Sequence, residues 1–134
     1  MGHLNPNADW DHIGGLTSDR VEAHSKGWML PSCHILYGEA LQDAAQRIVR
    51  EQIGIEEGLD LSGPKVFSEV YEPKCHPGAD KHWDLEFLFE GKLGQDELRK
   101  RTPRARVRLE FVRIDTTNKE KIARSHEGTL ARIP

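Results

Sequence analysis

Apolar residues recur at helical spacing between positions 38 and 53 of the chain. The recurring residues are Leu41, Ala44, Ala45, Ile48, Val49 and Ile53. Intervals of three and four place such residues on one face of a helix, which can then pack against the rest of a fold. Gly54 follows, and glycine suits the left-handed position at which many helices end. The pattern therefore predicts an amphipathic helix over 38–53.

Two later segments alternate apolar and polar residues with a period of two, which is typical of strands. The clearer one spans 82–91, where Trp83, Leu85, Phe87 and Phe89 share one face. The other spans 104–111 and carries a run of arginines on its polar face. We also expect strands at 27–30 and 65–72, a loop at 73–81, a short helix at 95–101 and another after the capping residues 115–118.

The beginning of the chain gives weaker signals. Residues 1–12 are polar and rich in turn formers, and we expect them to be disordered or to be an addition to the natural chain. A strand at 12–17 is predicted, although Gly14 and Gly15 weaken it. No good candidate for an earlier strand is visible. The sheet edge left open is expected to be covered by an irregular segment or by a second copy in a homodimer.

Size and composition indicate one soluble domain. The chain has 134 residues, a net charge of −3 and 31% charged residues. No apolar run approaches the roughly 18 residues of a membrane span, and no secretory pattern opens the chain. Two cysteines, Cys33 and Cys75, do not make a disulfide framework, so a reduced, cytoplasmic setting is expected. The net charge argues against nucleic acid as a partner.

The stretch over 28–55 carries the most specific motif. Tryptophan, leucine and proline lead into it, and glutamate, arginine, an aliphatic residue, glutamate and glycine follow at fixed spacing: Trp28, Leu30, Pro31, Glu39, Arg47, Val49, Glu51, Gly54 and Ile55. This motif resembles the signature of the Nudix hydrolases, G-x5-E-x7-R-E-U-x-E-E-x-G-U with U aliphatic, placed here at 33–55. Three positions depart from it, because Cys33, Ile48 and Gln52 stand where the family has Gly, Glu and Glu.

The resemblance implies an α+β fold, an α/β/α sandwich with a mixed sheet. A signature loop at 31–37 and the helix after it would carry the site, and the strand at the N-terminal edge would be incomplete. The whole chain, 1–134, is expected to form this single domain.

The resemblance also implies a divalent ion, Mg²⁺ or Mn²⁺, held against a diphosphate by carboxylates on the helix. Here Glu51 is expected to be the main metal ligand, with Gln52 offering a neutral oxygen. The backbone carbonyl of Cys33 or of Ser32 would be a further ligand. The family carries three carboxylates on this part of the helix and this chain has only Glu51, so metal binding is left open.

Three residues are candidates for catalytic roles. Glu51 is the first. Arg47 lies four residues before it on the helix and is expected to orient it. Glu39 is expected to support the loop or to bind the ion through water.

Four residues are candidates for substrate contact, namely His34, His76, His82 and Arg106. His34 lies in the signature loop, and the other two histidines lie in and after the loop that overhangs the substrate in the family. Arginine suits bidentate contacts with phosphate. The alternatives are solvated loop histidines, a solvated strand arginine, and a weak zinc pattern formed by Cys75 with two of these histidines.

The resemblance implies a hydrolase of a nucleoside diphosphate linked to another moiety, with a small nucleotide as partner. Loss of the first helical glutamate, with Arg47 and Glu51 kept, is similar to the GDP-mannose mannosyl hydrolase branch and suggests a nucleotide sugar. That branch has a Gln ligand and a His base that are missing at 102–106, so the base is left open among His76, His82 and His126. The competing hypothesis is a Nudix-fold module that has lost catalysis and binds a nucleotide or mediates assembly.

Overall fold

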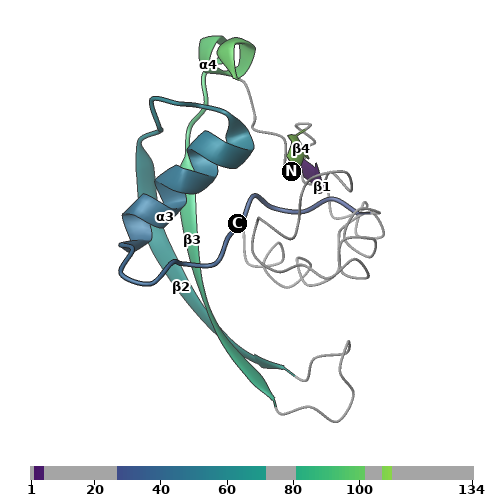
Figure 1. Cartoon of the computed structure of the whole chain (residues 1–134), viewed down its shortest axis with the longest axis vertical. Helices are drawn as coiled ribbons and strands as arrows, with labels where there is room; N and C mark the ends of the chain where they lie inside the picture. The colour runs from purple at the N-terminus through teal and green to yellow at the C-terminus, as the bar shows by residue number, and fades with distance from the viewer. Residues whose placement is uncertain (1, 5–26, 72–80, 102–106, 110–134) are drawn as a thin grey trace.

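The computed structural model describes residues 2–4, 27–71, 81–101 and 107–109. Its elements are shown in Figure 1 and are, along the chain, β1 (Gly2–Leu4), α3 (Leu41–Ile48), η1 (Val49–Ile53), β2 (Leu61–Tyr71), β3 (His82–Gly91), α4 (Gln95–Lys100) and β4 (Val107–Leu109). The strand predicted at 12–17 and the helix predicted after 115–118 lie outside the described residues.

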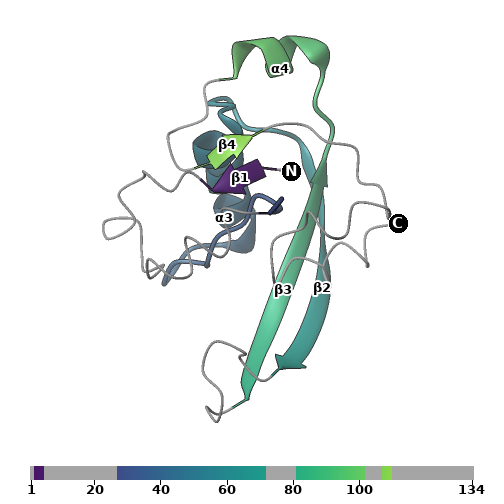
Figure 2. The same ribbon diagram turned by 90° about the vertical axis from the view of Figure 1, so that its right-hand side faces the viewer.

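A long antiparallel hairpin of β2 and β3 is the largest element of the fold (Figure 2). Leu61 lies opposite Gly91 at one end, and Tyr71 lies opposite His82 at the other. The strand predicted at 82–91 is confirmed. The strand predicted at 65–72 begins earlier, at Leu61, because pairing with β3 continues past an irregularity in register after Ser62.

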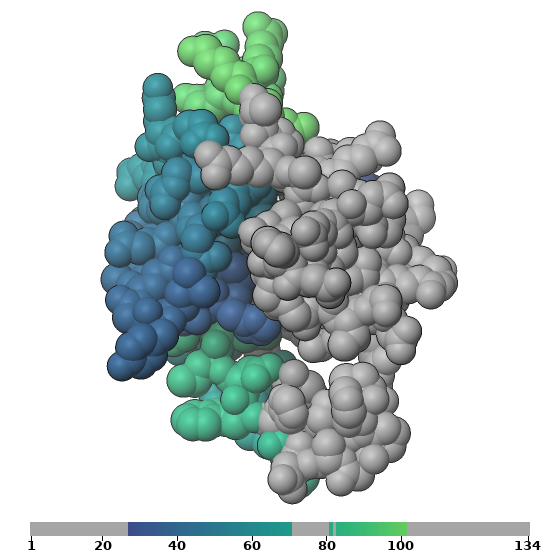
Figure 3. Space-filling model, viewed as in Figure 1, coloured from purple at the N-terminus to yellow at the C-terminus, as the bar shows by residue number. Residues whose placement is uncertain are grey.

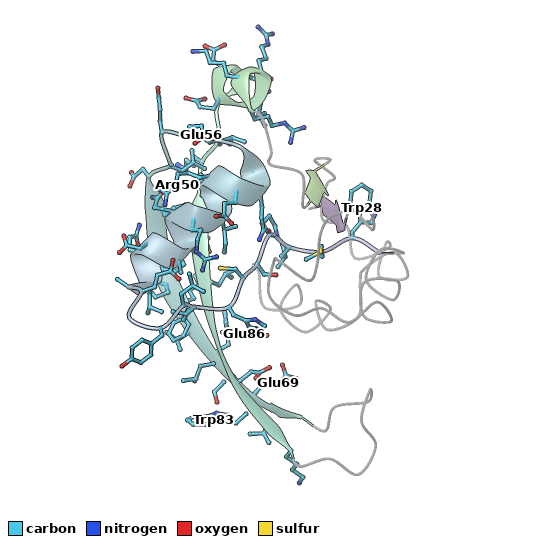
Figure 4. The ribbon with its side chains drawn as sticks, viewed as in Figure 1. Trp28, Arg50, Glu56, Glu69, Trp83 and Glu86 are labelled. Carbon is cyan, nitrogen blue, oxygen red and sulfur yellow. The ribbon has the colours of Figure 1, made fainter. Side chains whose placement is uncertain are left out.

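The outer half of this hairpin exposes apolar side chains. Val70 and Trp83 are paired across the strands and are 61% and 66% exposed, and Leu85 is 49% exposed. The Trp83 indole N–H donates to Ser68 Oγ at 2.7 Å. Figure 4 places Trp83 toward the end of the hairpin remote from α4. Phe87 is half-buried, so the apolar face that alternation predicts is covered at its inner part alone.

The predicted helix is confirmed as α3 running directly into η1, which is wound more widely than an α-helix. Ala44, Ala45 and Val49 are its buried residues. Gly54 ends the helix with φ of 84°, and its N–H donates to the Val49 carbonyl at 2.9 Å. This bond spans five residues, the π-type spacing often found at functional sites. Figures 1 and 2 show α3 to one side of the β2–β3 hairpin.

A second, short pairing brings the two ends of the described chain together. β1 and β4 are antiparallel, with Gly2 opposite Leu109 and Leu4 opposite Val107, and β4 lies against η1. Of the two alternatives expected for residues 1–12, disorder is wrong for residues 2–4, which form β1. Their partner strand lies more than a hundred positions away, so local composition carries no trace of the pairing. Strand β4 falls inside the strand predicted at 104–111, whose remaining residues are outside the described ranges.

Both pairings among the described strands are antiparallel, so the mixed sheet of the full sandwich stays a prediction. Trp28 and Met29 are each part of an isolated β-bridge, inside the strand predicted at 27–30. The short helix predicted at 95–101 is confirmed as α4. In the part of the chain that the structure describes, no helix has the length and apolar character needed to cross a membrane.

Candidate functional site

The loop before α3 is fastened to the helix by one arginine. Arg47 Nε donates to Glu39 Oε1 and Arg47 Nη2 donates to Glu39 Oε2, each at 2.8 Å. Arg47 Nη2 also donates to the His34 carbonyl at 3.0 Å, and the Leu36 N–H donates to Glu39 Oε2 at 3.0 Å. A two-point bond between guanidinium and carboxylate fixes direction as well as distance. The loop around residues 34–39 is therefore held in one orientation on α3.

Glu39 and Arg47 each stabilise the charged form of the other. Hydrogen bonding from Arg47, helped by the Leu36 N–H, lowers the pKa of Glu39 to about 2. The hydrogen bond to Glu39 raises the pKa of Arg47. Both side chains are largely covered, with 13% of Glu39 and 19% of Arg47 exposed. Glu39 is thus a permanent anion in neutral solution and is already engaged with Arg47 and the loop backbone.

Gln52 makes a second connection between the same loop and the helix. The Ser32 N–H donates to Gln52 Oε1 at 3.1 Å, and Gln52 Nε2 donates to the Ser32 carbonyl at 2.7 Å. One side-chain amide thus satisfies the donor and the acceptor of one backbone residue. Figure 3 shows the segment that carries these contacts, in blue and teal, as one continuous part of the visible surface.

Gln46 makes the same type of contact with the segment that follows the helix. The Leu59 N–H donates to Gln46 Oε1 at 3.1 Å, and Gln46 Nε2 donates to the Leu59 carbonyl at 2.6 Å. We did not single out Gln46 from the sequence. A glutamine on the polar side of a helix carries no local sign of a partner thirteen residues away.

Cys33, within the loop, is half-buried. Its Sγ is 3.9 Å from the Ala44 carbonyl oxygen, as a weak donor. Burial is the main cause that raises the pKa of Cys33, and Glu39 and Glu51 add to it against the opposing effect of Arg47. The side chain is therefore a thiol in neutral solution, which matches the packing role that a small buried cysteine commonly has.

Glu51 is the carboxylate that η1 contributes to this corner. It is partly exposed, and its negative charge acts on the pKa of both Arg47 and Cys33, so it lies within electrostatic reach of the loop. In a regular α-helix, positions 48, 51 and 52 would share one face, and the wider turn of η1 changes that spacing. Ile48 precedes this turn and offers no ligand atom.

The predicted substrate-binding residues are not brought together within the described ranges. His34 is exposed on the loop. His82 begins β3, and its side chain is not described. His76 and Arg106 lie outside the described residues. Their roles stay predictions.

Comparison with known families decides the classification. A family model described as NUDIX domain matches residues 8–133. The chain belongs to the Nudix family. No curated protein and no solved structure matches it. The resemblance found at 33–55 is thereby confirmed at the level of the family, whose members hydrolyse nucleoside diphosphate derivatives and generally use divalent metals such as Mg²⁺. The GDP-mannose mannosyl hydrolase branch stays a prediction.

The donor atoms at this corner of the Nudix domain do not fit an ion that the protein alone would hold. The Gln52 side-chain oxygen and the Ser32 carbonyl oxygen were both expected as metal ligands. Each instead accepts a hydrogen bond, the first from the Ser32 N–H and the second from Gln52 Nε2. Across the described ranges, no cluster of three His, Cys, Asp or Glu side chains could hold a metal. Mg²⁺ is commonly bound by one or two carboxylates together with substrate phosphates. An ion that arrives on a diphosphate needs only a single carboxylate such as Glu51.

Proposed function

We propose that this Nudix chain hydrolyses a nucleoside diphosphate linked to another moiety, with a nucleotide sugar as the leading substrate class. The substrate would be taken up as its magnesium or manganese complex in a cytoplasmic setting. The observation that carries the proposal is the loop–helix unit itself. Arg47 ties the loop to α3 beside Glu51, in a chain that matches the family over 8–133.

The residues would divide the work as follows. Glu51 would contact the metal–diphosphate complex, and His34, exposed on the fixed loop, would contact a phosphate oxygen. Arg47 and Glu39 would be positioning residues, because they form hydrogen bonds with each other and with the loop backbone. Attack by water requires a base within reach of its proton. His76, His82 and His126 remain the candidates for that base.

The test is a screen of nucleoside diphosphate compounds with and without Mg²⁺, following which bond breaks. The decisive variant is Glu51→Gln, which removes the charge and keeps the size. We expect it to lower kcat/KM by roughly 100-fold or more, as the loss of an acid–base or charge-stabilising group does. Glu57→Gln is the matched control, since Glu57 is exposed after the helix, and it should keep full activity. Equal activity of the two variants would remove Glu51 from the mechanism.

A second function is favoured by the contact between Gln52 and Ser32 and by the apolar residue at Ile48. Gln52 and Ile48 stand where the family signature has glutamates, as expected in a module that binds a nucleotide without cleaving it. Calorimetry with the same compounds separates the two functions. Binding without turnover of any compound, with or without Mg²⁺, supports the module, whereas turnover supports the hydrolase.

A further inference from the structure

Gln46 in α3 and Gln52 in η1 form two copies of one contact, with segments on either side of the helical unit. Gln52 binds the N–H and the carbonyl of Ser32 in the loop before α3, and Gln46 binds the N–H and the carbonyl of Leu59 in the segment after η1. The four donor–acceptor distances lie between 2.6 and 3.1 Å. The repetition indicates that the amide, with one donor and one acceptor side, is what each position requires.

The chemistry of the amide explains why glutamine stands at position 52. A carboxylate accepts hydrogen bonds and, when ionised, donates none. Glutamate at 52 could still accept from the Ser32 N–H, but its second oxygen would face the Ser32 carbonyl oxygen, where Gln52 Nε2 now donates at 2.7 Å. Two acceptors at that distance repel unless a cation lies between them. Glutamine avoids this repulsion, because its Nε2 donates a hydrogen bond to the Ser32 carbonyl.

We propose that Gln52 holds the loop onto η1 at Ser32 in place of a divalent ion. In the free protein the loop would then stay attached to η1 without metal, an arrangement called the closed loop below. Three contacts support this: the two-point bond to Ser32, the Arg47 bond to the His34 carbonyl and the Arg47 pair with Glu39. Together they hold the loop at residues 32, 34 and 39 with groups of the chain alone.

A consequence concerns how an ion is taken up, and this consequence rests on the proposed function. With Gln52 and Ser32 engaged with each other, Glu51 alone is too small a ligand set for Mg²⁺, which keeps its waters unless phosphates replace them. An ion would then bind at this corner together with a diphosphate. The closed loop itself is a property of the free protein and does not depend on catalysis.

The first experiment compares Gln52→Glu with Gln46→Glu in the full chain. Mn²⁺ binding is followed by electron paramagnetic resonance without nucleotide, and Tm is measured with and without Mg²⁺. We expect Gln52→Glu to bind one more Mn²⁺ than the wild type and to gain Tm when Mg²⁺ is added. Gln46→Glu makes the same chemical change at Leu59, but position 46 lies next to Arg47 and not next to a carboxylate such as Glu51, so its Tm should fall without any gain of Mn²⁺. A Gln52→Glu protein that folds and gains no Mn²⁺ overturns the proposal.

The second experiment takes its deciding readout, protection with and without Mg²⁺, from the wild type, so that readout does not depend on a variant that folds. Hydrogen exchange of the Ser32 amide is measured by nuclear magnetic resonance. We expect protection in metal-free protein, with no change when Mg²⁺ is added, and exchange roughly 3- to 10-fold faster in Gln52→Ala, as the loss of one net hydrogen bond implies. Protection that appears only with Mg²⁺ overturns the proposal. None of these readouts involves turnover, so failure of the hydrolase proposal would be seen separately, in the compound screen.

Discussion

Arg47 and Glu39 lie eight residues apart in the chain and meet through two hydrogen bonds of 2.8 Å each. The guanidinium fork matches the carboxylate edge, so that helix α3 and the loop before it are joined in a fixed orientation. The same guanidinium also binds the His34 carbonyl at 3.0 Å. The order of the loop should therefore depend on the shape of this side chain as well as on its charge.

Replacement of Arg47 by lysine should test that dependence. Lysine keeps the positive charge but is a point donor, and it cannot bind both oxygens of Glu39 and the His34 carbonyl in the same plane. We expect Arg47→Lys to have a lower Tm than the wild type in a thermal melt. Arg50→Lys is the control, because Arg50 is exposed on the same helical unit, and it should leave Tm unchanged. Equal melting of both variants would mean that charge alone holds the loop.

The Glu39 carboxylate should make stability depend on acid. Its pKa falls from the usual 4.5 to about 2 on folding. Because the folded value is the lower one, the ionised form favours the native state. The full stabilisation is present above pH 4.5 and is lost as the pH falls from 4.5 to about 2. Urea unfolding of the wild type and of Glu39→Gln across this range should converge toward acid, since the variant has no proton to take up. Parallel curves would contradict the assigned shift.

The sequence predicted the local part of this fold well and the long-range part poorly. The helix ending at Gly54 and the strand at 82–91 follow from periodicity and from glycine chemistry, which are local. The strand Gly2–Leu4 depends on a partner at 107–109, which no local pattern reveals.

The candidate site divides in the same way. The motif identified Glu39, Arg47 and Glu51 as belonging to one unit. It did not show that Arg47 bonds to Glu39 across the loop, or that Gln52 is engaged by Ser32. These contacts depend on the path of the loop, which the spacing of residues along a helix does not determine.

Val49 should be a sensitive position in the core. It is 3% exposed and lies where α3 passes into η1. Val49→Ala removes two buried methyl groups, and we expect it to lower the free energy of unfolding by about 2 kcal/mol once the cavity is included. Val66→Ala is the matched control, because Val66 is 56% exposed on β2, and it should cost less than about 1 kcal/mol. Urea titration of both variants measures the difference, and similar costs would contradict the burial of Val49.

Gly58 should be intolerant of any side chain, for two separable reasons. Its φ is 81°, a left-handed conformation that costs an L-residue about 1–2 kcal/mol. A Cβ there would also lie 2.6 Å from Gln46 Oε1, the atom that accepts from the Leu59 N–H. We expect Gly58→Ala to lower the free energy of unfolding by more than the backbone cost alone, because the amide of Gln46 cannot move aside without losing its bonds to Leu59.

A double-mutant cycle with Gln46→Ala separates the two reasons. In the Gln46→Ala background the amide is gone, so Gly58→Ala should cost only the backbone strain, and the two single changes should sum to more than the double change. Residues in contact commonly show interaction energies of about 0.5–3 kcal/mol in such cycles. Strictly additive costs would show that the Gln46 side chain gives way freely, and the bond between Gln46 and Leu59 would then not fix the segment that follows the helix.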